Sequence, residues 1–141
     1  MVDSLENRVL WRAIAPTPNP ESMRVYNRQK SGSVQIAKSA SIINDAAIVH
    51  TVTAGKTFYL CAVTSTIDNK SGGNSWGGIR LRNVGDTYQF DFIIFQGDDP
   101  YANTDSLTFN PPMEIIAGWD VYIQSGGAGV MIYGFCYGYE L

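Results

Sequence analysis

The chain has 141 residues, of which 45% are hydrophobic and 16% charged, and its formal net charge is −3. This length suits one domain with a sizeable core. Residues 1–38 hold six basic and three acidic residues, whereas residues 39–141 hold four basic and ten acidic ones. An acidic body lacks the basic surface that nucleic acid requires, and no run approaches the roughly 18 apolar residues of a membrane span. We therefore expect neither nucleic acid nor a membrane as a partner.

The first 32 residues differ from the rest of the chain. The segment 15–20 holds three prolines, and proline lacks an amide donor and forces its predecessor into an extended conformation. We predict that residues 1–32 form an N-terminal arm with a stiff Pro-rich linker, and that Arg8, Trp11 and Arg12 anchor it to a partner. No apolar run near Met1 has the length of a signal peptide.

From residue 33 onward, short apolar segments alternate with turn signals, a pattern typical of a β-sandwich or barrel. The expected strands are 34–43, 48–52, 57–66, 79–83, 87–96, 107–109, 113–116, 119–124 and 129–141. Between them we expect a polar, glycine-rich loop over 68–78, an acidic loop over 97–105, and an interruption at Pro111 and Pro112.

Two of the expected turns resemble each other. Residues 52–60 and 115–123 each place Ala-Gly between apolar residues and an apolar–Tyr–apolar strand. Glycine there supplies the positive φ that a hairpin turn needs. Repeated hairpins of this kind fit the two Greek keys of a jelly roll, so residues 33–141 are predicted to form an all-β, antiparallel β-sandwich with jelly-roll topology.

The last strand carries an aromatic ladder. Side chains alternate across a strand, so one face holds Met131, Tyr133, Phe135, Tyr137 and Tyr139, and the other holds Gly134, Cys136 and Gly138 among apolar residues. Solvated faces do not hold four aromatic residues in a row. We predict that these four line an interface between copies of the chain, usually closed by cyclic symmetry, although the sequence leaves open which face meets the partner.

The sequence shows no catalytic or cofactor-binding pattern. His50 is the only histidine, the four glutamates are widely spaced, and Cys61 and Cys136 lie inside predicted strands, where buried free thiols are expected. We therefore expect no enzyme activity, no cofactor and no metal centre, although the acidic loop offers oxygen atoms of the kind that Ca²⁺ prefers. Trp76 and Tyr101, both in expected loops, are candidates for stacking on a sugar.

Residues 48–141 resemble the compact trimeric jelly rolls of the tumour-necrosis-factor/C1q type that occur in tailed-phage virion proteins such as head decoration proteins, head fibres and tail tips. The resemblance is carried by residues 53–60, by residues 111–120 and by the Gly/Tyr-rich last strand. It implies a homotrimer whose last strand lies near the threefold axis, and an N-terminal segment that fixes the module to the particle.

The expected function is therefore that of a non-enzymatic virion protein, made in the host cytoplasm and attached to a capsid or tail through residues 1–32. The main alternative is a carbohydrate- or receptor-binding tip module of a fibre, with Trp76 and Tyr101 in its site. A secreted cytokine-like or adhesin domain and an enzyme are further alternatives, which the missing leader and the missing catalytic clusters disfavour.

Overall fold

A computed structural model describes residues 32–70, 73–85, 87 and 89–141 of the chain. The predicted arm and its anchoring residues Arg8, Trp11 and Arg12 lie outside the described residues. Strands are the only regular elements in the described part, which contains no helix long and apolar enough to cross a bilayer.

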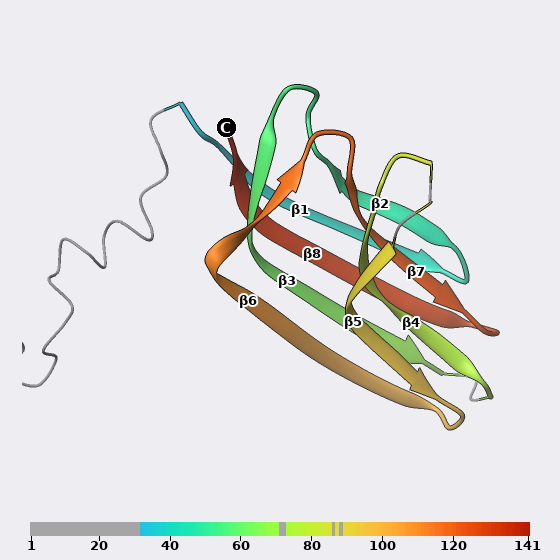
Figure 1. Cartoon of the computed structure of the whole chain (residues 1–141). Coiled ribbons are helices and arrows are strands. Elements are labelled where there is room, and N and C mark those ends of the chain that lie inside the picture. Colours follow the sequence, from blue (N-terminus) through green and yellow to red (C-terminus); the bar gives the residue numbers. More distant parts are fainter. Residues whose placement is uncertain (1–31, 71–72, 86, 88) are drawn as a thin grey trace, which may run out of the picture. The chain divides into compact units, whose positions relative to one another are not determined.

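Eight strands form two four-stranded antiparallel sheets that pack face to face (Figure 1). The strands are β1 (Val34–Ile43), β2 (Ala46–Thr51), β3 (Thr57–Asn69), β4 (Ser75–Arg82), β5 (Gln89–Gly97), β6 (Tyr101–Ile116), β7 (Asp120–Gly126) and β8 (Val130–Glu140). The first sheet has the order β1-β8-β3-β6 and the second sheet has the order β2-β7-β4-β5. This is the strand order of a jelly roll, and the predicted fold class is confirmed.

The core lies between the two sheets because each strand turns alternate side chains inward. In β8 the even-numbered residues from Val130 to Glu140 are buried, and the odd-numbered residues between them are exposed or half-buried. The fully buried apolar side chains come from both sheets and include Phe58, Leu60, Val63, Ile67, Ile79, Val121, Ile123, Val130 and Ile132.

The two turns that resemble each other in sequence occupy equivalent places in the fold. Gly55 lies between β2 and β3 with a φ of 74°, and Gly118 lies between β6 and β7 with a φ of 81°. The turns also contact each other: the Val52 amide donates to the Trp119 carbonyl at 2.9 Å, and the Gly118 amide donates to the Val52 carbonyl at 3.3 Å. The internal repeat therefore marks one end of the jelly roll.

The predicted break at Pro111 and Pro112 is wrong, because β6 runs without interruption from Tyr101 to Ile116. β6 is an edge strand, and prolines are tolerated at edges and bulges, where a missing amide donor removes no ladder hydrogen bond. The register with β3 steps from Leu60↔Met113 to Ala62↔Thr108, so the prolines lie in a bulge.

The predicted glycine-rich loop over 68–78 is also too long, since β3 extends to Asn69 and β4 begins at Ser75. Gly77 and Gly78 are strand residues that allow close packing and do not form a turn. A Cβ on Gly77 would lie 2.9 Å from Cδ1 of Ile132, and one on Gly78 would overlap the carbonyl of Ile93. The acidic loop is shorter than predicted as well, because Tyr101 already belongs to β6.

Candidate functional site

The outer side of the first sheet carries the aromatic ladder. Tyr133, Phe135 and Tyr137 point away from the core and are 46%, 38% and 36% exposed. Large apolar rings in a continuous row on an open sheet are uncommon on a monomer surface. We call these three residues, with the side chains that flank them on β1 and β3, the aromatic face.

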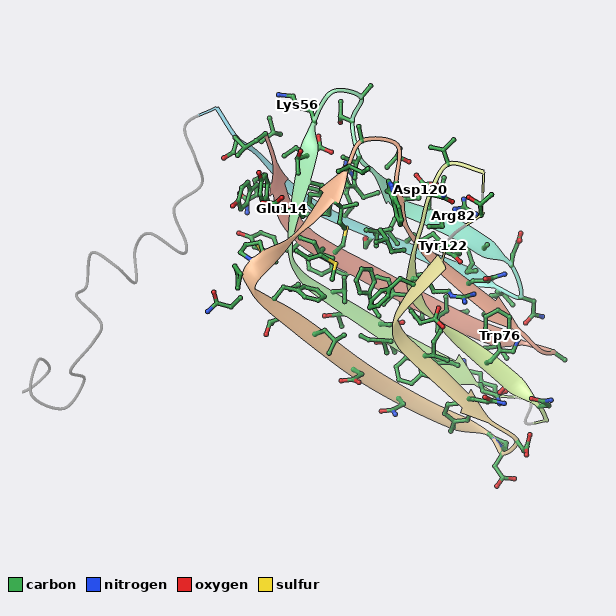
Figure 2. All side chains as sticks on the ribbon, viewed as in Figure 1. Lys56, Trp76, Arg82, Glu114, Asp120 and Tyr122 are labelled. Carbon is green, nitrogen blue, oxygen red and sulfur yellow. The ribbon has the colours of Figure 1, made fainter. Side chains whose placement is uncertain are left out.

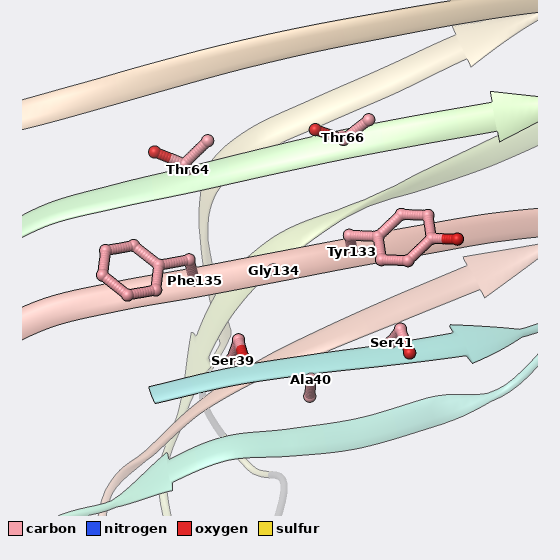
Figure 3. Close-up of a pocket in the computed structure, with 8 residues that line it drawn as sticks. All are labelled: Ser39, Ala40, Ser41, Thr64, Thr66, Tyr133, Gly134 and Phe135. Carbon is pink, nitrogen blue, oxygen red and sulfur yellow. The ribbon is translucent and has the colours of Figure 1, made fainter. Parts of the chain in front are cut away.

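Small side chains flank the ladder on both neighbouring strands (Figure 3). Ser39 and Ser41 lie on β1, and Thr64 and Thr66 lie on β3. Together with Ala40, Tyr133, Gly134 and Phe135 they line a shallow depression in which no residue is charged. The threonine hydroxyls are paired with β6, Thr64 with Ser106 at 2.9 Å and Thr66 with Thr104 at 2.8 Å. These paired hydroxyls reduce the polarity that the aromatic face presents.

The far end of the ladder is held more tightly than its middle. Tyr139 is half-buried and stacks on Tyr59 of β3 with ring centroids 5.0 Å apart and planes inclined by 12°. Burial, and then the neighbouring Cys61, Tyr59 and Glu114, raise the pKa of Tyr139 above its ordinary value. Its phenol is therefore neutral at physiological pH.

The glycines of β8 face the core, as the alternation predicts. A Cβ on Gly134 would overlap Cγ2 of Ile123 in the second sheet. A Cβ on Gly138 would overlap the backbone and ring of its own sheet, at the Tyr59 carbonyl and the Phe58 side chain. Of the two glycines of β8, only Gly134 therefore serves close packing of the two sheets, and Gly138 makes room for Phe58.

The four residues predicted as an interface thus share one face, but they are not equally accessible. Tyr133, Phe135 and Tyr137 are exposed, whereas Tyr139 is half-buried by its own chain. The odd-numbered face is the one open to solvent, so of the two faces it is the one that a partner could reach. That another copy covers it remains a prediction.

Trp76 lies on the outer side of the second sheet, not in a loop as predicted. It belongs to β4, is half-buried, and packs over Gly126 of β7, where a Cβ would lie 2.6 Å from the indole Nε1. Farther along the same strands, Arg82 pairs with Asp120 at 3.3 Å and lies over the Tyr122 ring, with 4.6 Å from Cζ to the centroid (Figure 2). This outer side therefore carries two arginines paired with carboxylates beside exposed apolar side chains, Ile48 and Ile94, and Trp76 lies toward one end.

Tyr101 does not share a surface with Trp76. It begins β6, is half-buried against the core, and its hydroxyl is buried. The expectation of an exposed loop aromatic is wrong at this position, because the residue pairs with Asn69 of β3 and its ring covers Gly97. The structure brings Trp76 together instead with Arg80, Asp91, Ile94 and Gln96. In the sequence, Arg80 and Arg82 alternate with apolar residues, a pattern that indicates a strand with one side open to solvent. Gly77 and Gly78 indicate a loop by composition, so the sequence did not show that the same strand continues to Trp76.

His50, the only histidine of the chain, pairs with a glutamate of the opposite sheet. His50 Nε2 lies 2.9 Å from a carboxylate oxygen of Glu140, which also accepts from the Thr53 amide at 3.0 Å. Burial alone would raise the pKa of the Glu140 carboxyl, but the hydrogen bonds from Thr53 and His50 outweigh burial and lower it. The pair joins β2 of the second sheet to β8 of the first. The described residues hold no cluster of three His, Cys, Asp or Glu side chains placed to bind a metal ion.

No protein-family model and no curated protein matches the chain. A solved chain of Bacillus endospore appendages, a family of disulfide-linked pili, has a TM-score of 0.37 and 15% identity, and covers 81% of this chain and 90% of its own. A chain from the virus-like particle of Macrobrachium rosenbergii extra small virus has a TM-score of 0.36 and 10% identity, covering 80% and 82%. A carbohydrate-binding module of Cellvibrio mixtus lichenase 5A has a TM-score of 0.30 and 11% identity, covering 77% and 88%. Similarities this distant carry no argument about function.

Proposed function

We propose that the chain is a non-enzymatic structural protein that assembles through its aromatic face into a closed homo-oligomer, a trimer. The observation that carries this proposal is the row formed by Tyr133, Phe135 and Tyr137, three large rings that lie exposed in succession along β8, an inner strand of the first sheet. Aromatic residues with little charge around them are the composition of interface cores. Tyrosine suits such a contact because its ring is apolar and its hydroxyl can still find a partner.

A second copy fits this face better than a charged partner would. The depression between Tyr133 and Phe135 is floored by Gly134 and bordered by short hydroxyl side chains, so a ring from a neighbouring copy has room to enter it (Figure 3). The face therefore offers both protruding rings and a recess to receive one, so one part of it can pack against a different part of the next copy, as the head-to-tail contacts of a closed ring require.

The N-terminal segment supports a separate proposal about where the oligomer is attached. We propose that residues 1–32 attach the oligomer to a particle such as a phage capsid or tail, with Arg8, Trp11 and Arg12 as anchoring residues. Deleting residues 1–22 should leave the mass of the oligomer unchanged and abolish co-sedimentation with the particle. Retained co-sedimentation would refute the anchoring role.

The assembly role is tested by moving a charge onto either sheet. Phe135→Asp places a carboxylate in the middle of the aromatic face, and Ile48→Asp places one on the outer side of the second sheet at a side chain that is 49% exposed. Because an unpaired charge in an interface core is strongly unfavourable, Phe135→Asp should sediment as a monomer at micromolar concentration while Ile48→Asp keeps the wild-type mass. Circular dichroism checks that both variants are folded. Equal masses for the two variants would refute assembly through this face.

A further inference from the structure

The outer side of the second sheet holds a depression that the assembly does not use. It is lined by Trp76, Arg80, Asp91, Ile94 and Gln96, and we call it the Trp76 depression. Trp76 and Arg80 come from β4, and the other three come from β5. It lies on the opposite sheet from the aromatic face, so it would stay accessible in the proposed oligomer.

The depression stays open because its floor is backbone. Gly78 lies between Trp76 and Arg80 on the outward side of β4, and β5 approaches so closely that a Cβ there would overlap the Ile93 carbonyl. Gly78 therefore places no side chain of its own between the indole and the Arg80 guanidinium, whose Cζ lies 6.0 Å from the centroid of the Trp76 ring. On one side stands the Trp76 ring, fixed over Gly126, and on the other stands Ile94, which is 42% exposed.

The polar groups of the depression are held in place without a ligand. Arg80 donates to the Asp91 carboxylate, and its Nη1 donates to Oε1 of Gln124 at 2.9 Å. The Arg80 side chain is only 17% exposed, whereas Asp91 is 47% exposed and has lone pairs left for another donor. Gln96 is exposed and pairs in register with Trp76, so its amide offers both donors and an acceptor beside the indole. Such preorganisation lowers the entropic cost of binding.

The charges on this side exclude an anion as the natural ligand. Arg80 is paired with Asp91 and Arg82 with Asp120, so each guanidinium already has its carboxylate. A phosphate or sulfate would have to displace one of these carboxylates or bind beside it. A neutral ligand that carries hydroxyl groups meets no such penalty.

We propose that the Trp76 depression binds a neutral saccharide. The apolar C–H face of a pyranose ring stacks on the indole of Trp76, which is large, flat and already immobilised. The sugar hydroxyls then donate to Asp91 and exchange hydrogen bonds with the Gln96 amide, and Ile94 covers the ring edge. A small set of placed polar groups around an apolar surface is the usual composition of a ligand site. This inference does not depend on the proposed assembly, because it concerns the other sheet.

The test uses the full chain on an array of neutral oligosaccharides with gluco, galacto and manno configurations, printed beside sialylated and sulfated glycans. The best neutral oligosaccharide is then titrated calorimetrically, so that the affinity per site is measured without avidity. Trp76→Ala should weaken binding about tenfold through the lost stacking, and the exposed Gln96→Ala should weaken it about fivefold through lost hydrogen bonds.

Tyr133→Ala is the matched control, since it removes an exposed ring from the aromatic face. It should weaken assembly and leave the affinity per site for the saccharide unchanged, whereas Gln96→Ala should do the reverse. This contrast separates a failure of the saccharide proposal from a failure of the assembly proposal. No binding on the neutral panel, binding only to anionic glycans, or equal affinity in wild type, Trp76→Ala and Gln96→Ala would each overturn the proposal.

Discussion

Gly134 offers the sharpest test of how the two sheets are packed. It lies in the middle of β8 with its missing side chain directed at the second sheet, where Ile123 Cγ2 is the nearest atom. A Cβ on Gly134 would come closer than 3.0 Å to that methyl, whereas ordinary van der Waals contact begins at 3.4 Å. Gly134 has no positive φ, so Gly134→Ala tests space alone and not backbone strain.

The expected magnitude follows from two opposed effects. Replacing glycine by alanine in an allowed conformation stabilises a fold by about 0.4–1 kcal/mol through the unfolded chain, while overpacking of a tight core costs about 1–3 kcal/mol. Ile123 is fully buried and cannot move into solvent, so overpacking should prevail. We expect Gly134→Ala to lower the free energy of unfolding by about 1–2 kcal/mol.

A double-mutant cycle with Ile123→Ala identifies the cause. Ile123→Ala alone should cost about 2–5 kcal/mol by opening a cavity, and the methyl of Gly134→Ala should then fill part of that cavity. The double variant should therefore be more stable than the sum of the two single effects by about 1 kcal/mol or more. Urea unfolding followed by circular dichroism measures all four proteins at one concentration. A stabilising Gly134→Ala, or strict additivity, would refute close packing of the sheets at this point.

Two further predictions concern the ionisable groups of the fold. The Glu140 carboxyl has a folded-state pKa below its ordinary value of 4.5, so the stability that it contributes is present above that pH and is lost as the pH falls through the lower folded-state value. Glu140→Gln should therefore flatten the loss of stability between about pH 5 and pH 3, as measured by urea unfolding. An unchanged slope would contradict the stabilising role of the pair formed by His50 and Glu140. Burial raises the pKa of the Cys136 thiol to about 12. The Phe135→Asp variant, which is expected to be a monomer, tests this burial within a single chain. A thiol reagent at pH 8 should label only the half-buried Cys61 of the folded variant, and both cysteines once the variant is unfolded in urea. Rapid labelling of two thiols without denaturant would place Cys136 outside the core.

Much of the fold could be predicted from the alternation of apolar residues and the positions of glycine. The two Ala-Gly turns and the alternating last strand were sufficient to predict a jelly roll and to sort the side chains of β8 onto their faces. Pattern and turn chemistry are local, and they survive in the structure because the sheets bury one side of every strand.

Two of the errors share one physical cause, which is that the packing around a glycine or a proline decides whether that residue ends a strand or belongs to one. Gly77 and Gly78 indicate a loop by composition, yet they allow β4 to lie against Ile132 and Ile93. Pro111 indicates a break, yet it lies in an edge-strand bulge. The partnership of His50 with Glu140 spans 90 residues and joins different sheets, so no local pattern could indicate it.

The same limit applies to the candidate sites. The ladder of Tyr133, Phe135 and Tyr137 was evident because it lies on one strand. The Trp76 depression was not, because Arg80, Asp91 and Gln96 come from two strands that only the fold brings together. Residues that act across strands require the register, which the sequence does not give.

The central claim is that the aromatic face of one copy is covered by other copies of the chain. The molar mass of the wild-type protein in solution, measured by light scattering during size-exclusion chromatography at micromolar concentration, tests it most directly. Three chain masses are expected for the wild type and one for Phe135→Asp under the same conditions. A wild-type chain that elutes as a stable monomer at that concentration would contradict it.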